Sequence, residues 1–176
     1  MAVLTDIKRR LRLTIGDITH LRVDAIVNAA NPSLLGGAGV DGAIHRAAGP
    51  ALLDECRKLG GCPPGEARLT RGYRLPAAHV IHTVGPIWQG GGCGEQQILE
   101  NCYRSCIEIA RSQRFGEIAF SAISTGVYGF PREAAARIAV TTVGQHLVGR
   151  RLPGSVIFVC FDVATLHAYQ AALGDA

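Results

Sequence analysis

A stretch rich in glycine and alanine, Asn28 to Gly49, carries polar side chains whose types and spacing suggest chemistry. Its 22 residues include five glycines and six alanines, with Asn31, Asp41 and His45 among them. Asp41 and His45 are four residues apart, so they would share one face of a helix. Clustered glycines let backbone bend sharply and approach a bound group closely. The stretch therefore predicts a binding loop beside a carboxylate, an amide and an imidazole.

Each of these three side chains also has a purely structural interpretation. An aspartate in the first turn of a helix often only caps the helix or complements its dipole. Asn31 precedes Pro32 and could merely hold the turn. A histidine on such a helix face is more often packed than catalytic, so we expect His45 to support its neighbours rather than to react.

A second glycine-containing junction of strand, loop and helix spans Ser121 to Val140. Its loop reads Ser124-Thr125-Gly126-Val127-Tyr128-Gly129, and Pro131 would stand in the first helical turn, where its missing N–H costs nothing. Both loops lead to a helix N-terminus, which is a ready anion site. Such loops gather at the carboxyl ends of strands in an open α/β sheet. We expect them to hold a diphosphate, although either loop alone could be a tight turn.

Two familiar motifs are disfavoured. Gly37 to Gly42 matches G-x-G-x-x-G, but eight residues separate it from the expected strand end at Asn28, whereas a dinucleotide fingerprint follows its strand directly. Ser124 does not lie in G-x-S-x-G, the setting of a nucleophilic serine. A nicotinamide dehydrogenase and a serine hydrolase are therefore poor interpretations.

The elements that would position the two loops alternate between strand and helix patterns. The expected strands are Arg10–Ile15, Ala25–Asn28, Leu69–Gly72, His79–Val84, Glu117–Ile123 and Val156–Phe161. The expected helices are Asp41–Ala48, Pro50–Leu59, Glu95–Ser112, Arg132–Val148 and Ala164–Leu173. This alternation predicts an α/β fold with helices on both faces of a mainly parallel sheet. No linker or repeat interrupts the pattern, so we expect a single domain over residues 1–176.

Composition narrows the class of protein further. The net charge is +4, and the basic residues fall into small groups: Lys8 to Arg10 with Arg12, then Arg68, Arg71 and Arg74, then Arg150 and Arg151. We interpret these groups as solvated surface, with a nucleic-acid patch as the alternative. There is no signal-peptide pattern, and the apolar runs are too short to span a bilayer, so we expect a cytoplasmic protein away from membranes.

The six cysteines do not form a C-x-x-C motif. Cys102 and Cys106 share a face of an expected helix, while His79 and His82 lie in an expected strand. No set has the spacing of a structural zinc site, so we expect reduced, mostly buried thiols and no metal.

Five short motifs occur in a fixed order along the chain. They are GDIT (Gly16–Thr19), VDAIVNAAN (Val23–Asn31), GVDGAIH (Gly39–His45), HTVGP (His82–Pro86) and ISTGVYG (Ile123–Gly129). With this ordered set, roughly residues 10 to 165 resemble the macrodomain family, in particular the MacroD-type branch that includes bacterial O-acetyl-ADP-ribose deacetylases. The resemblance implies a three-layer α/β/α sandwich around a central mixed, mainly parallel sheet, with ADP-ribose in its cleft.

The resemblance also implies a role for each part of the site. Asp17 and the backbone of Ile18 would bind adenine, with Phe161 lying against the ring. The diphosphate and distal ribose would contact Gly37, Gly39, Val40, Asp41, Ser124, Thr125, Gly126 and Val127. Tyr128 would close over the distal ribose, and Asn31 and Asp41 match the pair tied to hydrolysis. Asp17 alone could instead be a helix cap, and Ala38 stands where many relatives have glycine.

The implied reaction is ester hydrolysis at the distal ribose, without metal or cofactor, by a monomer. The substrates would be O-acetyl-ADP-ribose or ADP-ribose on an acidic side chain of a protein. A carboxylate with an ordinary pKa of about 4 is a poor general base, so we expect Asp41 to position water while a substrate diphosphate oxygen helps to take the proton. The alternatives are a non-catalytic ADP-ribose reader and an RNA-binding regulatory protein.

Overall fold

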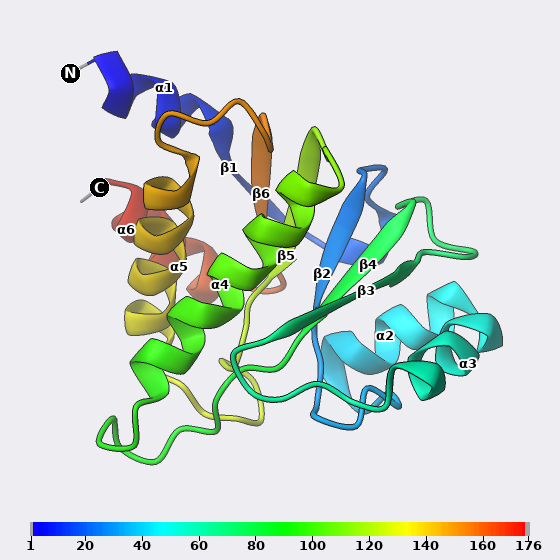
Figure 1. The fold of residues 1–176 in the computed structure, drawn as a ribbon. Helices are drawn as coiled ribbons and strands as arrows, with labels where there is room; N and C mark the ends of the chain where they lie inside the picture. The colour runs from blue at the N-terminus through cyan, green and yellow to red at the C-terminus, as the bar shows by residue number, and fades with distance from the viewer. Residues whose placement is uncertain (1, 175–176) are drawn as a thin grey trace.

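Six short strands form one sheet at the centre of the protein (Figure 1). The strands are β1 (Leu11–Ile15), β2 (Ala25–Ala29), β3 (Ala67–Arg71), β4 (His79–Thr83), β5 (Glu117–Ser121) and β6 (Ser155–Cys160). They are ordered β1-β6-β5-β2-β4-β3, and every neighbouring pair is parallel except β3 and β4. The structure, a computed structural model, describes residues 2–174. The sheet is therefore mixed and mainly parallel, as predicted.

Helices cover both faces of this sheet and complete three layers (Figure 1). They are α1 (Ala2–Arg10), α2 (Gly39–Ala48), α3 (Pro50–Leu59), α4 (Glu95–Ser112), α5 (Arg132–Leu147) and α6 (Val163–Gly174), with a short 3-10 helix η1 (Ile18–His20). One apolar cluster joins the sheet to α2 and α3, and the other joins it to α4, α5 and α6. The α/β/α prediction is confirmed.

Several predicted boundaries were wrong by a few residues. β3 starts two residues before Leu69, because its antiparallel register with β4 reaches back to Ala67. β6 ends at Cys160, which leaves Phe161 in the following loop. α2 starts at Gly39 rather than Asp41.

The N-terminal helix α1 was not predicted, and it changes the interpretation of the first basic group. The Arg10 guanidinium donates to the backbone carbonyls of Leu147 at 3.2 Å and Arg150 at 2.8 Å, and it also contacts the carbonyl of Pro153. Arg10 is therefore a structural residue that ties the start of β1 to the α5–β6 connection, not solvated surface.

The buried residues of the strands alternate between the two helical layers. Val27, Ile81 and Phe158 pack toward α4, α5 and α6, while Ile26 and Val80 pack toward α2 and α3. The expectation of mostly buried thiols is confirmed, since five of the six free cysteines are buried and Cys93 is exposed. Within residues 2–174, no helix is long and apolar enough to cross a membrane.

Candidate functional site

A cavity of about 340 Å³ lies between the two glycine-containing loops, at the carboxyl ends of β2 and β5. Of the predicted site residues, it brings together Asn31, Gly37, Gly39, Val40, Asp41, Ser124, Gly126, Val127 and Tyr128. Ala29, Ala30, Ala38, Gly85 and Ala122 complete the lining. The prediction gave no role to Gly85, although it lies in the HTVGP motif. A larger groove of about 520 Å³ between α4 and α5 lies elsewhere and is lined mainly by long polar side chains.

In the first loop, Gly37 lies between the Asn31 amide and the Asp41 carboxylate. A Cβ at Gly37 would lie 3.0 Å from Asp41 Oδ2 and 3.3 Å from Asn31 Nδ2, so both groups border the same small space. Ala38 adopts an extended backbone with φ −94°, which any residue can adopt, so its methyl group causes no backbone strain. The absence of a side chain at Gly37 thus leaves the Asp41 carboxylate and the Asn31 amide uncovered where both line the cavity.

Asn31 also holds its own turn, as its structural interpretation predicts. Its Nδ2 donates to the Gly36 carbonyl at 2.8 Å, and its Oδ1 accepts from the Ser33 backbone N–H at 3.0 Å and hydroxyl at 2.6 Å. An amide nitrogen has two N–H groups, so one can still reach a ligand. The turn fixes the direction in which that N–H points.

Asp41 is a buried carboxylate with one oxygen held and one unpaired. Oδ1 accepts from Asn28 Nδ2 at 2.7 Å, whereas Oδ2 has no hydrogen-bond partner within the described part of the chain. Burial raises the pKa of Asp41, against the opposing influence of Asn28 and His45. The premise of an ordinary pKa was therefore wrong, because tertiary packing removes water from this carboxylate.

His45 packs behind Asp41 on the next turn of α2. Its Nε2 lies 3.6 Å from Asp41 Oδ1, which is beyond hydrogen-bond length. The ring lies beneath Gly36, where an added Cβ would be 3.5 Å from His45 Cγ. His45 therefore supports the wall of the cavity by contact.

The second loop holds its backbone N–H groups ready for a ligand. Hydrogen bonds from Phe130 N to Ser124 O and from Gly129 N to Gly126 O, both 3.0 Å, close the loop. Within residues 2–174, the N–H groups of Thr125, Gly126, Val127 and Tyr128 donate to no other protein group. Preorganised N–H groups at a helix N-terminus favour an anion.

The side chain of Ser124 lies directly against the backbone of Gly85. Ser124 is buried with a left-handed backbone of φ 64°, and a Cβ at Gly85 would overlap its Oγ. Only glycine at position 85 therefore lets the second loop lie this close to the end of β4.

The predicted adenine-binding residues lie at the neighbouring strand ends and do not line the cavity. Asp17 follows β1 and Phe161 follows β6, and a hydrogen bond of 2.9 Å from Gly16 N to Cys160 O joins the two loops. Phe161 is 86% exposed. Asp17 Oδ1 accepts from Thr19 N at 2.8 Å and Thr19 Oγ1 at 2.7 Å, so it caps η1, and these bonds lower its pKa. Ile18 is buried, and Thr125 also lies outside the lining.

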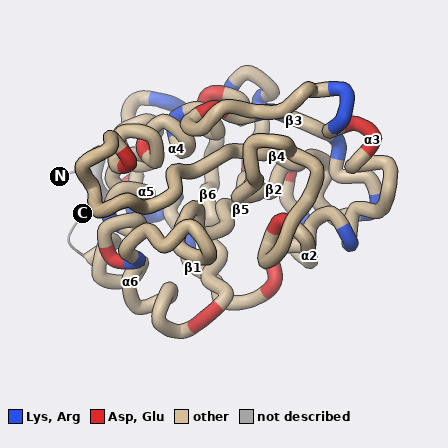
Figure 2. The backbone as a smooth tube through the Cα atoms, turned by 90° about the horizontal axis from the view of Figure 1, so that it is seen from below, with Lys and Arg blue, Asp and Glu red and all other residues tan. Residues whose placement is uncertain are grey.

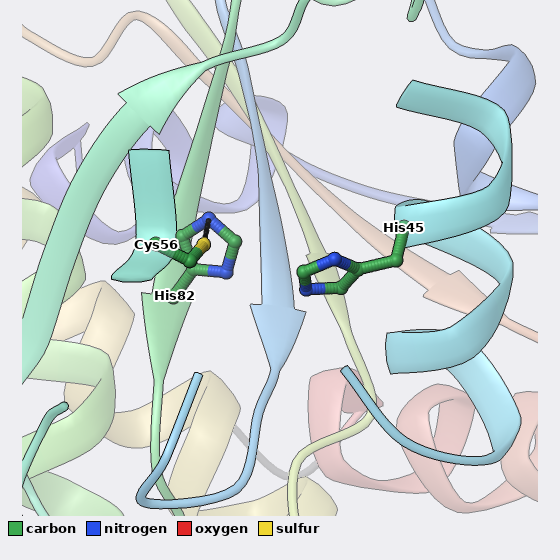
Figure 3. A group of neighbouring side chains, drawn as sticks. All are labelled: His45, Cys56 and His82. Carbon is green, nitrogen blue, oxygen red and sulfur yellow. Dashed lines mark hydrogen bonds between the residues drawn. The ribbon is translucent and has the colours of Figure 1, made fainter. Parts of the chain in front are cut away.

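A buried polar cluster beneath the cavity was not predicted. Figure 3 shows Cys56 beside His82, with His45 pointing toward them from α2; their ligand-type atoms lie within 4.8 Å of one another. Both ring nitrogens of His82 already have partners, Asn28 Nδ2 at 3.1 Å and Thr70 Oγ1 at 2.9 Å. Burial raises the pKa of the Cys56 thiol to about 11, which disfavours the thiolate that a metal requires. The cluster fits hydrogen-bonded packing better than a metal centre.

Comparisons with known proteins agree with this geometry. The Macro domain family matches residues 27–139. An O-acetyl-ADP-ribose deacetylase of Enterobacter cloacae is 57% identical over 162 residues, which cover 90% of this chain and 90% of the relative.

Solved structures show the same fold. A variant of the Oceanobacillus iheyensis macrodomain with ADPR has a TM-score of 0.90 and 44% identity, over 94% of this chain and 92% of that one. A Trypanosoma brucei macrodomain in complex with ADP-ribose has a TM-score of 0.89 and 44% identity, over 94% and 70%. This chain belongs to the macrodomain family.

Proposed function

We propose that this protein binds ADP-ribose and hydrolyses esters at its distal ribose, with O-acetyl-ADP-ribose as substrate. Removal of mono-ADP-ribose from acidic side chains of proteins is the second reaction in this proposal, because it breaks the same kind of ester bond. Residues 1–176 would act as one macrodomain. The similarity to a relative named O-acetyl-ADP-ribose deacetylase supports the first reaction.

The observation that carries the proposal is the unpaired Oδ2 of buried Asp41 at the cavity between the two loops. A reader of ADP-ribose needs the loops but has no need of a desolvated carboxylate there. Burial raises the pKa of Asp41, and a carboxylate of raised pKa accepts a proton more readily. This favours hydrolysis over binding alone.

In the proposed reaction, Asp41 Oδ2 accepts a hydrogen bond from the attacking water, and Asn31 orients the ribose. Water adds to the acyl carbon, the bond from the acyl carbon to the ribose oxygen breaks, and acetate leaves while the ribose oxygen gains a proton. The proton that the water loses passes to Asp41 or to a diphosphate oxygen of the substrate and from there to the departing ribose oxygen, and the second water proton is lost when the released acetic acid ionises to acetate. The free N–H groups of the second loop stabilise negative charge.

The remaining predicted residues would hold the rest of the ligand. Asp17 retains an oxygen that does not cap η1, and we propose that this oxygen and the backbone of Ile18 bind adenine. The exposed ring of Phe161 would lie against adenine. Tyr128, with Val127 and Thr125, would close over the distal ribose.

The first test is the release of ADP-ribose from O-acetyl-ADP-ribose by wild type and by Asp41→Asn. The asparagine keeps an oxygen for the Asn28 hydrogen bond but cannot accept a proton, so we expect kcat to fall by about 10²- to 10⁴-fold. The affinity for ADP-ribose, measured by calorimetry, should change far less. Asp54→Asn is the matched control, because Asp54 is an exposed aspartate on α3 that pairs with Arg57.

The same experiment separates the alternatives. If wild type binds ADP-ribose tightly but does not turn over the ester, the protein is a non-catalytic reader. If Asp41→Asn loses binding and turnover equally, Asp41 has only a structural role.

An RNA-binding protein would instead show RNA affinity that falls steeply as salt is added. Figure 2 shows Lys and Arg in separate segments rather than in one continuous stripe, and Arg12 and Arg68 pair with Glu117 and Glu66.

A further inference from the structure

We propose that His82, held by Thr70, is a positioning residue that acts through Asn28 to fix the orientation of Asp41. A hydrogen-bonded chain runs from Thr70 on β3 through His82 on β4 and Asn28 on β2 to Asp41 on α2. The resemblance gave no role to Thr70, His82 or Asn28. The inference rests on the proposed hydrolysis, in which the direction of Asp41 Oδ2 sets the position of the attacking water.

The direction of each hydrogen bond follows from the contacts. The same Asn28 atom lies 2.7 Å from Asp41 Oδ1 and 3.1 Å from His82 Nδ1. An ionised carboxylate only accepts, so this atom is the amide nitrogen, and it donates to both partners. His82 Nδ1 therefore accepts, and its proton must be on Nε2.

His82 Nε2 in turn donates to Thr70 Oγ1 at 2.9 Å, and the Thr70 hydroxyl lies 3.5 Å from the Val80 carbonyl. The hydroxyl is thus left to accept from the ring. Each step of the chain has one donor and one acceptor. This series of hydrogen bonds ends on Asp41 Oδ1, which leaves Asp41 Oδ2 free to face the cavity.

Burial keeps this arrangement from changing. Asn28 and His82 are fully buried, and Thr70 is 2% exposed, so water does not compete for these hydrogen bonds. Burial lowers the pKa of His82 to about 3, so its ring stays neutral near pH 7. The titratable groups around it are His45 and Asp41 on α2 and Cys56 on α3.

The pairing of β2 with β4 sets the distance between Asn28 and His82, the two central residues of the hydrogen-bonded series. Asn28 and His82 are directly paired in the parallel register of β2 and β4. Asn28 Oδ1 has no hydrogen-bond partner within residues 2–174, so the amide is oriented only by its two donated bonds. Without the acceptor at His82, the Asn28 amide would be free to turn and its bond to Asp41 would weaken.

The first comparison removes one hydroxyl on each face of the sheet. Thr70→Val removes the acceptor of the His82 proton. Thr83→Val is the matched control, because Thr83 is also buried and donates to a backbone carbonyl, that of Glu66 at 2.8 Å, but it follows His82 directly and therefore faces the other side of the sheet. We expect Thr70→Val to lower kcat for O-acetyl-ADP-ribose about 5- to 10-fold with little change in ADP-ribose affinity, and Thr83→Val to leave kcat within about 2-fold of wild type.

Two substitutions of His82 test the chain at its centre. His82→Phe keeps a planar ring but removes both nitrogens, and we expect kcat to fall about 10- to 100-fold with ADP-ribose still bound. His82→Gln, whose amide offers both an acceptor and a donor, should recover part of this loss. Equal kcat in wild type and folded His82→Phe, or equal losses in Thr70→Val and Thr83→Val, would overturn the proposal.

Nitrogen NMR of the histidine rings gives a test that needs no turnover and no variant. The proposal requires a neutral His82 with its proton on Nε2. A proton on Nδ1 would overturn it, because Asn28 Nδ2 could not then donate to that atom. An inactive wild type with the expected tautomer would instead refute the proposed hydrolysis and leave the hydrogen-bonded chain in place.

Discussion

The two faces of the sheet are both covered by helices but are built from different chemistry. On the face toward α4, α5 and α6, Phe158 lies between Phe120 and Tyr169, with ring centroids 5.9 and 4.9 Å away. On the face toward α2 and α3, the ends of β2 and β4 carry Asn28 and His82, both fully buried. Apolar packing is non-directional, whereas hydrogen bonds orient their partners. The first face therefore provides stability, and the second gives up some apolar packing to hold Asp41.

The largest effect on stability should come from the aromatic face. Phe158→Ala should lower the free energy of unfolding by about 3–5 kcal/mol, because it leaves a cavity among Phe120 and Tyr169. Urea denaturation measures the loss. Turnover per folded molecule should stay close to wild type. A loss below about 1 kcal/mol would show that this face can collapse around the gap.

A smaller effect is expected where the second loop meets β4. Gly85→Ala would drive a methyl group into Ser124 Oγ, so overpacking should lower the free energy of unfolding by about 1–3 kcal/mol. It should also weaken ADP-ribose binding, because the second loop must move to make room. Gly144→Ala is the matched control. Gly144 lies in the interior of α5, and a Cβ there would make only an ordinary contact of 3.6 Å with Ile7 Cγ2. That change should stabilise the protein by roughly 0.5–1 kcal/mol. Calorimetric titration with ADP-ribose and urea denaturation test both variants. Equal ADP-ribose affinities in Gly85→Ala and wild type would contradict the predicted clash with Ser124.

The smallest effect concerns the pH dependence of stability at Asp41. Burial raises its folded pKa above the unfolded value of about 3.9, so its favourable contribution is complete below that value and is lost as pH rises through the folded pKa. Asp41→Asn cannot ionise and should therefore be more stable than wild type at pH 7, with a difference that shrinks toward pH 4. Urea midpoints at the two pH values measure this. A less stable Asp41→Asn at pH 7 would mean that the carboxylate is held more favourably than burial suggests.

Much of the site could be predicted because its residues lie in short, continuous segments. Asn31, Gly37 and Asp41 fall within one stretch, and Ser124 and Tyr128 within another, so turn chemistry and helix starts already indicate two binding loops. The ordered motifs then indicated the macrodomain family, which the comparisons show. The alternation of strands and helices was enough for the sandwich, although β3 and the unpredicted α1 show that local patterns place weaker elements poorly.

The sequence by itself determined the class of fold, the two loops and the carboxylate between them, because these depend on neighbours along the chain. Only the tertiary structure decided that Gly85 must leave room for Ser124, that burial raises the pKa of Asp41, and that Thr70, His82 and Asn28 form one chain. Thr70, His82 and Asn28 lie on three different strands, and hydrogen bonding between strands makes neighbours of residues that are far apart in sequence. Register and burial are properties of the assembled sheet, so no local pattern could reveal them.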